Sequence, residues 1–509
     1  MDYSLEDYIE QIGMLHRDEH TDACIEQQTG TNAIESRKRK ANTDIIYLSH
    51  RSVGNDGLDK LVHAILSAHQ MEKECRLRNN TDSSDLLQQD DDRMYLAKKI
   101  HLRCTNIKRG ITSLALLLSR SNSTEVLDLS SNQLGNECIT ELCDAISSHC
   151  HEQSSLHSIF LRRCQISCEG VIAIASLLVP GNSEWAPLPI KTLDLSRNEI
   201  NSDGITALAQ AISWNGCSLE ALDLSRCNIT AERSRDLHRL FSVLLSNARN
   251  AAIAHALDSR VPLAEHTSNL LTLKLNGNEL QSDCFNSIAA CIAGDSFTDD
   301  NNNRKVHYCP SLKNLYLDNT NMSSLSAKKL AKALVTNTSL KTLSLSENSF
   351  GDDAAKAFAD GLRSNRTLSL LLMGRSKYMT QEGVEALATC VYDENHNGTL
   401  LALAASNNVI EDFGLGNQTS ARLDYALHFN DNGNDECSIQ RKKIASFLNR
   451  DCVRTMHHFA AFFAVKELNR KVGRSTALPF VVKNCNLSCI FEMMRGMPEV
   501  CLQSYFVVK

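Results

Sequence analysis

The segment LLTLKLNGNEL, residues 270–280, decides the fold of this chain. It places Asn278 among regularly spaced leucines, at Leu270, Leu273, Leu275 and Leu280. The alternation of apolar and polar residues in its centre is typical of a short β-strand with one buried face. A short polar side chain just after such a strand can satisfy backbone groups at a buried bend. The segment therefore predicts a strand that ends in a tight turn.

The same pattern, L-x-x-L-x-L-x-x-N/C-x-L, recurs along most of the chain. Counted by their first position, copies begin at residues 43, 97, 124, 156, 190, 219, 270, 312, 340, 368 and 400, and the last reads Leu400, Leu403, Ala405, Asn408, Ile410. Apolar residues at three- and four-residue steps follow most copies, as at Leu208, Ala209 and Ile212, and this spacing predicts a helix. One repeat is thus a strand, a turn and a helix, which buries its apolar face only when repeats stack.

The ninth position of the pattern alternates between asparagine and another polar or thiol side chain. It reads Thr105, Asn132, Cys164, Asn198, Cys227, Asn278, Thr320, Asn348, Ser376 and Asn408. With this alternation the chain resembles the long-repeat, ribonuclease-inhibitor-like subclass of leucine-rich-repeat proteins, which includes Ran GTPase-activating proteins and the repeat domains of NOD-like receptors. The resemblance implies an α/β solenoid, an open horseshoe with a parallel sheet on the concave face and helices on the convex face.

Three regions are expected. Residues 1–42 form a flexible N-terminal segment with a short helix and the basic run Arg37–Lys40, residues 43–410 form the solenoid of about eleven repeats, and residues 411–509 form a helical cap. Insertions are expected near residues 72–93, 231–268 and 295–308. The first and third contain polar runs, at 79–85 with 90–92 and at 299–303, that predict solvated loops, whereas the second has helical spacing and predicts an extended helix.

Composition excludes several classes of protein. The 509 residues carry 53 Lys and Arg against 60 Asp and Glu, a net charge of -7, so no overall positive field indicates a nucleic-acid binder. No apolar run approaches the roughly 18 residues of a membrane span, and the acidic start does not resemble a secretory signal. The 19 cysteines are scattered and odd in number, which favours reduced thiols in the cytoplasm. Nuclear entry through Arg37–Lys40 is an alternative.

No catalytic or cofactor motif occurs in the sequence. Phosphate-loop, nucleophile-elbow and H-E-x-x-H patterns are absent. Residues 393–398 match half of a calcium loop, but Ala404 stands where a bidentate carboxylate is needed. The cysteines and histidines between Cys452 and Cys501 lack the paired spacing of a zinc site. We therefore expect no enzyme activity, no cofactor and no metal.

The variable positions between the leucines should face the concave side, because side chains alternate across a strand. Candidate partner-binding residues there are Arg103, Phe160, Arg162, Arg163, Asp194, Arg197, Asp223, Arg226, Lys274 and Tyr316. The arginines recur at one position of successive repeats, and Asp128, Asp194 and Asp223 recur at another. Two interpretations stay open: the two columns neutralise each other, or they form a mixed-charge docking strip.

The main hypothesis is a non-catalytic scaffold that binds a protein partner, with no small-molecule substrate, membrane or nucleic acid. A GTPase activator of the Ran type is the alternative, on the resemblance alone. That family has a strongly acidic tail, whereas residues 411–509 hold 13 basic and 10 acidic residues. A ribonuclease-inhibitor-like binder of a basic enzyme is disfavoured by the arginines on the proposed face.

Overall fold

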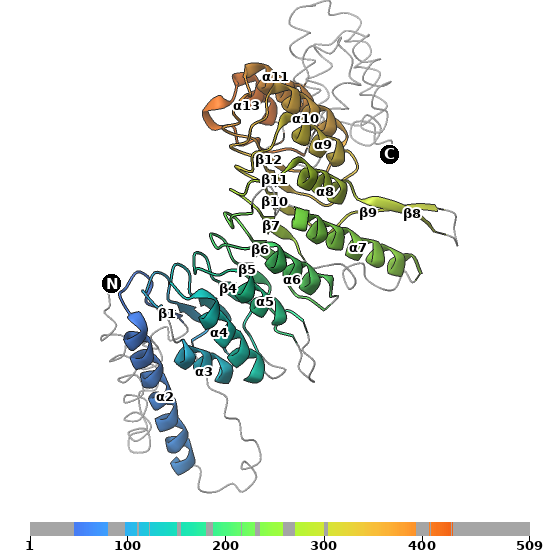
Figure 1. Cartoon of the computed structure of the whole chain (residues 1–509). Helices are drawn as coiled ribbons and strands as arrows, with labels where there is room; N and C mark the ends of the chain where they lie inside the picture. Colours follow the sequence, from blue (N-terminus) through green and yellow to red (C-terminus); the bar gives the residue numbers. More distant parts are fainter. Residues whose placement is uncertain are drawn as a thin grey trace, which may run out of the picture. The chain divides into compact units, whose positions relative to one another are not determined.

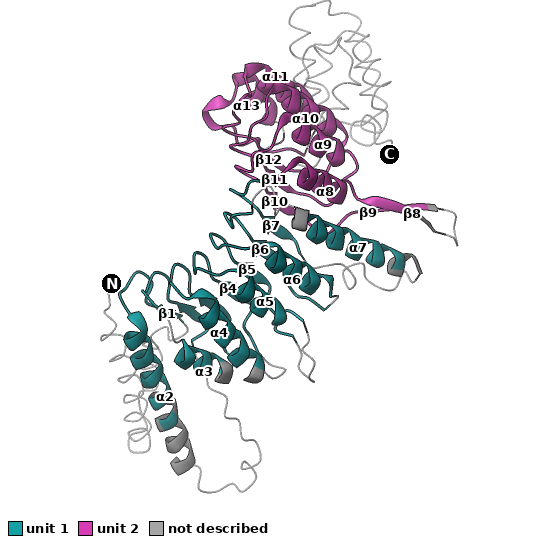
Figure 2. Cartoon of the chain, viewed as in Figure 1, with its two compact units in different colours: residues 1–279 teal, residues 280–509 magenta. Residues whose placement is uncertain are grey.

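The computed structural model describes residues 45–79, 97–108, 111–121, 123–149, 154–179, 187–214, 216–229, 235–257, 270–299, 304–392, 407, 409–428 and 430. The chain divides into two compact units, residues 1–279 (unit 1) and residues 280–509 (unit 2), coloured separately in Figure 2. Each unit is a stack of strand–turn–helix repeats.

Unit 1 alternates strands and helices from β1 to β7 (Figure 1). Its elements are β1 (Ile45–Tyr47), α2 (Gly54–Asn79), β2 (Lys99–His101), α3 (Thr112–Arg120), β3 (Val126–Asp128), α4 (Gly135–His149), β4 (Ser158–Phe160), α5 (Cys168–Ser176), β5 (Thr192–Asp194), α6 (Ser202–Ser213), β6 (Ala221–Asp223), α7 (Arg235–Leu257) and β7 (Thr272–Lys274). Each strand pairs in parallel with the next, so that Leu193 of β5 lies between Ile159 of β4 and Leu222 of β6.

Unit 2 continues the same alternation and adds a hairpin. Its elements are α8 (Ser282–Ala293), β8 (Asp295–Asp299), β9 (Arg304–Tyr308), β10 (Asn314–Tyr316), α9 (Ser324–Leu334), β11 (Thr342–Ser344), α10 (Asp352–Ser364), β12 (Leu370–Leu372), α11 (Gln381–Val391), the short 3-10 helix η3 (Gly416–Gln418) and α13 (Ala421–Leu427). Strands β10, β11 and β12 are parallel and in register. Among the described residues, none of the helices is long and apolar enough to cross a bilayer.

The predicted α/β solenoid, with parallel strands alternating with helices, is confirmed. Each of the first ten predicted copies, in the described part of the chain, has a strand that begins two residues after the predicted start. The leucines of the pattern form the core between sheet and helices, with Leu193 and Leu195 at most 1% exposed. Helix α6 adds the buried Leu208 and Ile212, as its spacing predicts, and the Asn201 side chain caps its first turn.

The alternation at the ninth position has a direct structural cause. Asn198 is buried, and its Oδ1 accepts hydrogen bonds from the amides of Cys164 (2.9 Å) and Ile166 (3.1 Å) in the preceding repeat. Its Nδ2 donates to the carbonyls of Leu161 and Leu195, both at 2.8 Å. Asn132, Asn278 and Asn348 repeat this arrangement. One asparagine therefore serves two repeats, which leaves the intervening position to a smaller side chain.

The residues between the asparagines complete the turns. The Cys164 thiol donates to the Leu129 carbonyl at 3.3 Å, and the Cys227 thiol donates to the Leu195 carbonyl at 3.3 Å. The Thr320 hydroxyl donates a hydrogen bond to the Leu317 carbonyl at 2.8 Å. The predicted burial of Asn198 and Asn278 at these bends is confirmed, since they are 3% and 1% exposed.

The predicted register of the last copy is wrong. Ile410 was assigned to the end of that copy, but it is fully buried at the start of the next repeat, and Asp412 forms a parallel bridge with Leu370 of β12. The amides of Leu371 and Met373 donate to backbone carbonyls of this strand. The repeats therefore extend beyond residue 410 to Asn430, whereas residues 400–406 and Asn408 of the predicted copy lie outside the described residues.

A second series of buried asparagines explains this register. Asn365 Nδ2 donates to the carbonyls of Leu334 and Asn337, and Asn407 Nδ2 donates to those of Leu362 and Asn365. Each of these asparagines lies three residues before the first leucine position of its repeat, and its Oδ1 accepts from that residue's amide. Ile410, three residues after Asn407, is therefore a first position.

The insertions have mixed outcomes. The predicted extended helix is confirmed as α7, and α2 runs to Asn79, beyond which residues 80–96 are not described. The insertion near residues 295–308 contains a hairpin in which β8 and β9 pair antiparallel, which the sequence did not predict, whereas residues 300–303 of the predicted solvated loop lie outside the described residues. The predicted N-terminal segment 1–42 and residues 431–509 of the predicted cap lie outside the described residues.

Candidate functional site

Three arginines occupy one position on consecutive strands of unit 1. Arg163, Arg197 and Arg226 each follow a strand by three residues and are exposed. Strands β4, β5 and β6 are parallel and in register, with Phe160 opposite Asp194 and Asp194 opposite Asp223. Adjacent strands lie about 4.8 Å apart, so the three arginines span about 10 Å. We call the side of the ladder that carries the residues between the buried leucines the strand face.

The backbone at these arginines is fixed in the left-handed conformation, with φ of 54°, 58° and 55°. The amide of each arginine donates to a carbonyl of the next repeat, at 2.9, 2.8 and 2.7 Å. The other repeats share this conformation at the same position, where Gly277 and Asn319 adopt it readily and where His50, Cys104, Ser131, Glu347 and Arg375 also stand. For most other residues with a Cβ atom, the left-handed conformation raises the free energy of the folded state by about 1 kcal/mol. The turn is thus rigid, and it holds the arginines against the backbone preference.

Arg162 joins the three to form what we call the arginine cluster: Arg162, Arg163, Arg197 and Arg226. The pKa of Arg197 is lowered, chiefly by the positive charge of Arg162, then by partial loss of solvent and by the charges of Arg226 and Arg163. The guanidinium group of Arg197 therefore lies within reach of the positive charges of the other three. Within the described residues, none of the four has a carboxylate oxygen within 4.0 Å.

The neighbouring aspartates are used by the fold. Asp194 Oδ1 accepts from the amide of Ser196 at 2.8 Å, and Asp223 Oδ1 accepts from that of Ser225 at 2.9 Å. The pKa of Asp194 is raised, mainly by burial, and the opposing effect of the Arg162 charge is the smallest of its causes. Asp223 also pairs with Lys274, at 3.6 Å between Oδ2 and Nζ. The aspartates therefore close turns, and their ion pairs do not involve the arginine cluster.

The structure brings most of the predicted site residues onto the strand face of unit 1. Phe160 and Lys274 lie half-buried on β4 and β7, beside the strand ends that carry the arginine cluster. Arg103 is exposed after β2, separated from the cluster by β3. Tyr316 lies on β10 of unit 2, so it is not grouped with the others.

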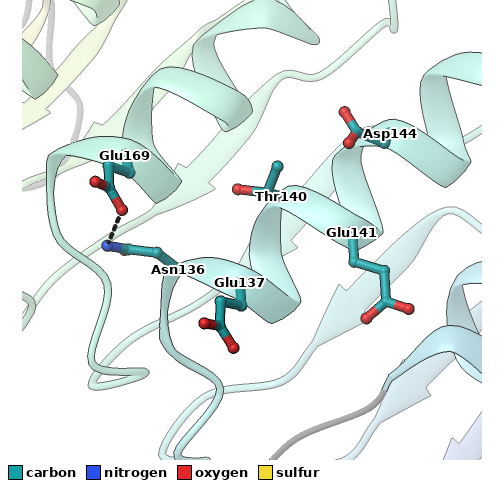
Figure 3. Close-up of a pocket in the computed structure, with 6 residues that line it drawn as sticks. All are labelled: Asn136, Glu137, Thr140, Glu141, Asp144 and Glu169. Atoms are coloured by element: carbon teal, nitrogen blue, oxygen red, sulfur yellow. Dashed lines mark hydrogen bonds between the residues drawn. The ribbon is translucent and has the colours of Figure 1, made fainter.

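The sequence interpretation missed an acidic hollow on the helix side of unit 1. Asn136, Glu137, Thr140, Glu141 and Asp144 of α4 and Glu169 of α5 line an open space of about 490 Å³ (Figure 3). Asn136 Nδ2 donates to Glu169 Oε2 at 3.2 Å. The spacing of Glu137, Glu141 and Asp144 places them on one helix face, and this signal was available in the sequence.

No metal centre is indicated in the part of the chain that the structure describes, since it holds no group of three or more His, Cys, Asp or Glu suited to an ion. Burial raises the pKa of the Cys164 and Cys227 thiols to about 12, so these thiols are protonated structural groups. The calcium-like segment 393–398 and the cysteines from Cys452 onward lie outside the described residues.

Comparison with known proteins agrees with this geometry. A family model described as Leucine Rich repeat matches residues 189–209, 217–232 and 336–359. The human NACHT, LRR and PYD domains-containing protein 3 is 29% identical over 302 residues, covering 55% of this chain and 28% of that protein. Mouse ribonuclease inhibitor is 24% identical over 265 residues, covering 52% of this chain and 48% of the inhibitor. The matched part thus spans less than half of either relative.

Stacked strand–turn–helix repeats with paired asparagine and thiol or hydroxyl positions define a repeat protein built around a parallel strand ladder. The chain has the fold of a leucine-rich-repeat solenoid and is similar to proteins of the ribonuclease-inhibitor-like subclass.

Proposed function

We propose that this protein is a non-catalytic scaffold that binds a protein partner through the strand face of unit 1, at the arginine cluster. The observation that carries the proposal is the set of four guanidinium groups on three adjacent repeats, with no carboxylate within 4.0 Å among the described residues. Arginine forks bind carboxylates in bidentate geometry, and arginine is enriched where interfaces concentrate their binding energy.

The rigid turns favour binding as well. A flexible loop loses conformational entropy when a partner orders it, whereas the backbone of Arg163, Arg197 and Arg226 is already bonded to the next repeat. The half-buried ring of Phe160 lies on β4 of the same face and would add apolar contact. Relatives in the subclass support a protein-binding role, since one of them is named as an inhibitor of a ribonuclease.

The test begins with partners identified by proximity labelling of the full chain in cells. For each purified partner, the dissociation constant is then measured against wild type and against the triple variant Arg163→Glu, Arg197→Glu, Arg226→Glu. We expect at least tenfold weaker binding and a flatter dependence on salt, because the variant removes the attraction between the two surfaces.

The matched control reverses three exposed basic residues on helices, Lys60 of α2, Arg249 of α7 and Lys332 of α9. It changes the net charge by the same amount and should leave binding within about twofold, since exposed charges remote from an interface act weakly through screening. A larger loss in the control would move the interface to the helix side. Faster GTP hydrolysis by a captured small GTPase would replace the scaffold proposal with that of a GTPase activator.

A further inference from the structure

The ligand chemistry that suits the arginine cluster is narrower than protein binding in general. We propose that the cluster binds an extended acidic segment of the partner protein, a run rich in aspartate and glutamate that crosses β4, β5 and β6. This inference rests on the proposed function and names the class of partner for the same surface. Three features of the structure support it.

The first feature is the charge that the fold leaves unbalanced. The carboxylates of Asp194 and Asp223, the nearest acids along the strands, accept hydrogen bonds from Ser196 and Ser225. Asp223 is paired with Lys274 in addition. No carboxylate oxygen of the described residues lies within 4.0 Å of the four guanidinium groups, and the attraction between Asp194 and Arg162 is the smallest effect on the pKa of Asp194, so the arginine cluster is only weakly neutralised there. Carboxylates on a partner would supply it with charge-assisted hydrogen bonds.

The second feature is the placement of like residues against the backbone preference. The residue three positions after each strand from β1 to β7 and from β10 to β12 is left-handed, from His50 to Arg375, and on three consecutive repeats that residue is arginine. Glycine or asparagine would relieve the steric conflict of that conformation. The conformation itself is common to the repeat turns, and it is the row of three like charges on rigid turns that fits a ligand crossing the repeats.

The third feature is the shape of the charged surface. The arginine positions are about 4.8 Å apart from strand to strand, and alternate residues of an extended peptide are about 6.6 Å apart on one side. Long arginine side chains bridge this difference. The carboxylates of Asp194 and Asp223 lie three residues before the arginines and limit the positive surface to a narrow strip. A peptide with acids on one edge fits such a strip, whereas a nucleic acid would meet the aspartates with its phosphates.

Gly277 has a positioning role at the end of the strip. A Cβ atom there would lie 2.7 Å from Cγ and 3.3 Å from Nε of Arg226, so the Arg226 side chain lies directly over this glycine. The glycine thereby lets the guanidinium group of Arg226 extend across the turn after β7. Replacement by alanine would displace Arg226 without removing any charge.

The experiment uses the full chain and fluorescence anisotropy at low and moderate salt. The probe is a labelled twelve-residue peptide of alternating glutamate and serine, compared with a glutamine–serine peptide of the same length and with a single-stranded oligonucleotide. We expect the glutamate peptide to bind at least tenfold more tightly than either comparison ligand. Equal binding of the glutamine peptide, or tighter binding of the oligonucleotide, would overturn the inference.

Two variants separate the inference from a folding defect. The triple variant Arg163→Asn, Arg197→Asn, Arg226→Asn introduces the residue that the fold tolerates at Asn319, so its melting temperature should be unchanged or higher while peptide affinity falls at least tenfold. Gly277→Ala, with all four arginines present, should weaken the peptide several-fold. Undiminished affinity in the triple variant would refute the acidic ligand.

The outcomes also distinguish the two proposals. If charge reversal disrupts the complex with an identified partner but the glutamate peptide does not bind, the scaffold function stands and the acidic-segment inference fails. If neither the partner nor the peptide responds to changes in the arginine cluster, both fail.

Discussion

Replacement of Asn278 by leucine should open the turns of two repeats together. Asn278 is 1% exposed. Its Oδ1 accepts from the amides of Cys227 (2.9 Å) and Ile229 (3.3 Å), and its Nδ2 donates to the carbonyls of Leu224 and Leu275, both at 2.8 Å. Leucine keeps the branch at Cγ but neither donates nor accepts, so two amides and two carbonyls lose their side-chain partner.

The magnitude follows from these four bonds. Each buried hydrogen bond contributes about 1 kcal/mol net, so the loss is about 4 kcal/mol if the turn cannot admit water. At 1.4 kcal/mol for each factor of ten, the equilibrium constant for local opening rises about 1,000-fold. The free energy of unfolding of the whole chain is a poorer measure, because a long repeat array need not unfold in one step.

Hydrogen exchange of the full chain measures this opening directly. We expect the amides of Cys227 and Ile229 to exchange up to about 1,000 times faster in Asn278→Leu, while amides in unit 2 keep their protection. Asn250→Leu, at an exposed position on α7, is the control and should change nothing. Less than tenfold faster exchange at both amides would mean that one asparagine does not support two repeats.

Three further predictions concern other parts of the chain. Five thiols have a pKa raised to about 12 by burial, and these are Cys143, Cys164, Cys227, Cys284 and Cys291. Their pKa in the unfolded chain is near 9, so the stability that they contribute is complete below pH 9 and is lost as the pH rises towards 12. Denaturant titrations at increasing pH should therefore show a falling midpoint denaturant concentration. Gly361→Ala on α10 should lower the stability of unit 2 by about 1–3 kcal/mol, because the added Cβ would lie 2.5 Å from the Ala331 carbonyl oxygen. The control Asp360→Ala changes an exposed residue of the same helix and should leave the stability unchanged. Equal melting temperatures of Gly361→Ala and wild type would contradict the close approach of α9 and α10. Alanine at all four residues of 37–40 should move a tagged nuclear protein to the cytoplasm, and an unchanged distribution in microscopy would exclude nuclear import through this run.

Leucine spacing alone was sufficient to place ten strands, because each leucine is buried by its own repeat and by the next. It failed at the C-terminal end, where two registers compete. Leu400, Leu403 and Asn408 match the pattern better than Ile410, Phe413 and Leu415 do, yet it is the segment of Ile410, Phe413 and Leu415, all buried, that pairs with β12. The deciding signal is the asparagine three residues before the first position, and its role depends on helix-end carbonyls that the leucine pattern does not include.

The hairpin of β8 and β9 was missed for a different reason. Its acidic and asparagine-rich centre is typical of a loop, and its pairing depends on contacts that the sequence does not display. One such contact joins the Tyr308 hydroxyl to Asp295 Oδ2, at 3.2 Å.

At the candidate site, the period of the repeat was enough to place Arg163, Arg197 and Arg226 in one row. Whether the aspartates neutralise that row was left open, because a carboxylate can bond either a guanidinium group or an amide two residues on. In the structure the amides of Ser196 and Ser225 donate to Asp194 and Asp223, and neither aspartate has an oxygen within 4.0 Å of the arginine cluster, although the Arg162 charge still acts on Asp194. The left-handed backbone at the arginines follows from the turn geometry and has no signature in the arginine side chain itself.

The sharing of asparagines gives the chain a module larger than its visible repeat. Removal of a single repeat from the middle would place two asparagines, or two small residues, at the ninth positions of adjacent repeats. One turn would then have either two asparagine side chains or no asparagine oxygen to accept from its amides. Removal of an even number, such as the two repeats from residue 156 to residue 218, would instead join Asn132 to the repeat of Cys227 and restore the alternation. Duplication, recombination and engineered shortening of this solenoid should therefore proceed in steps of two repeats, with odd-numbered products selected against at the level of folding.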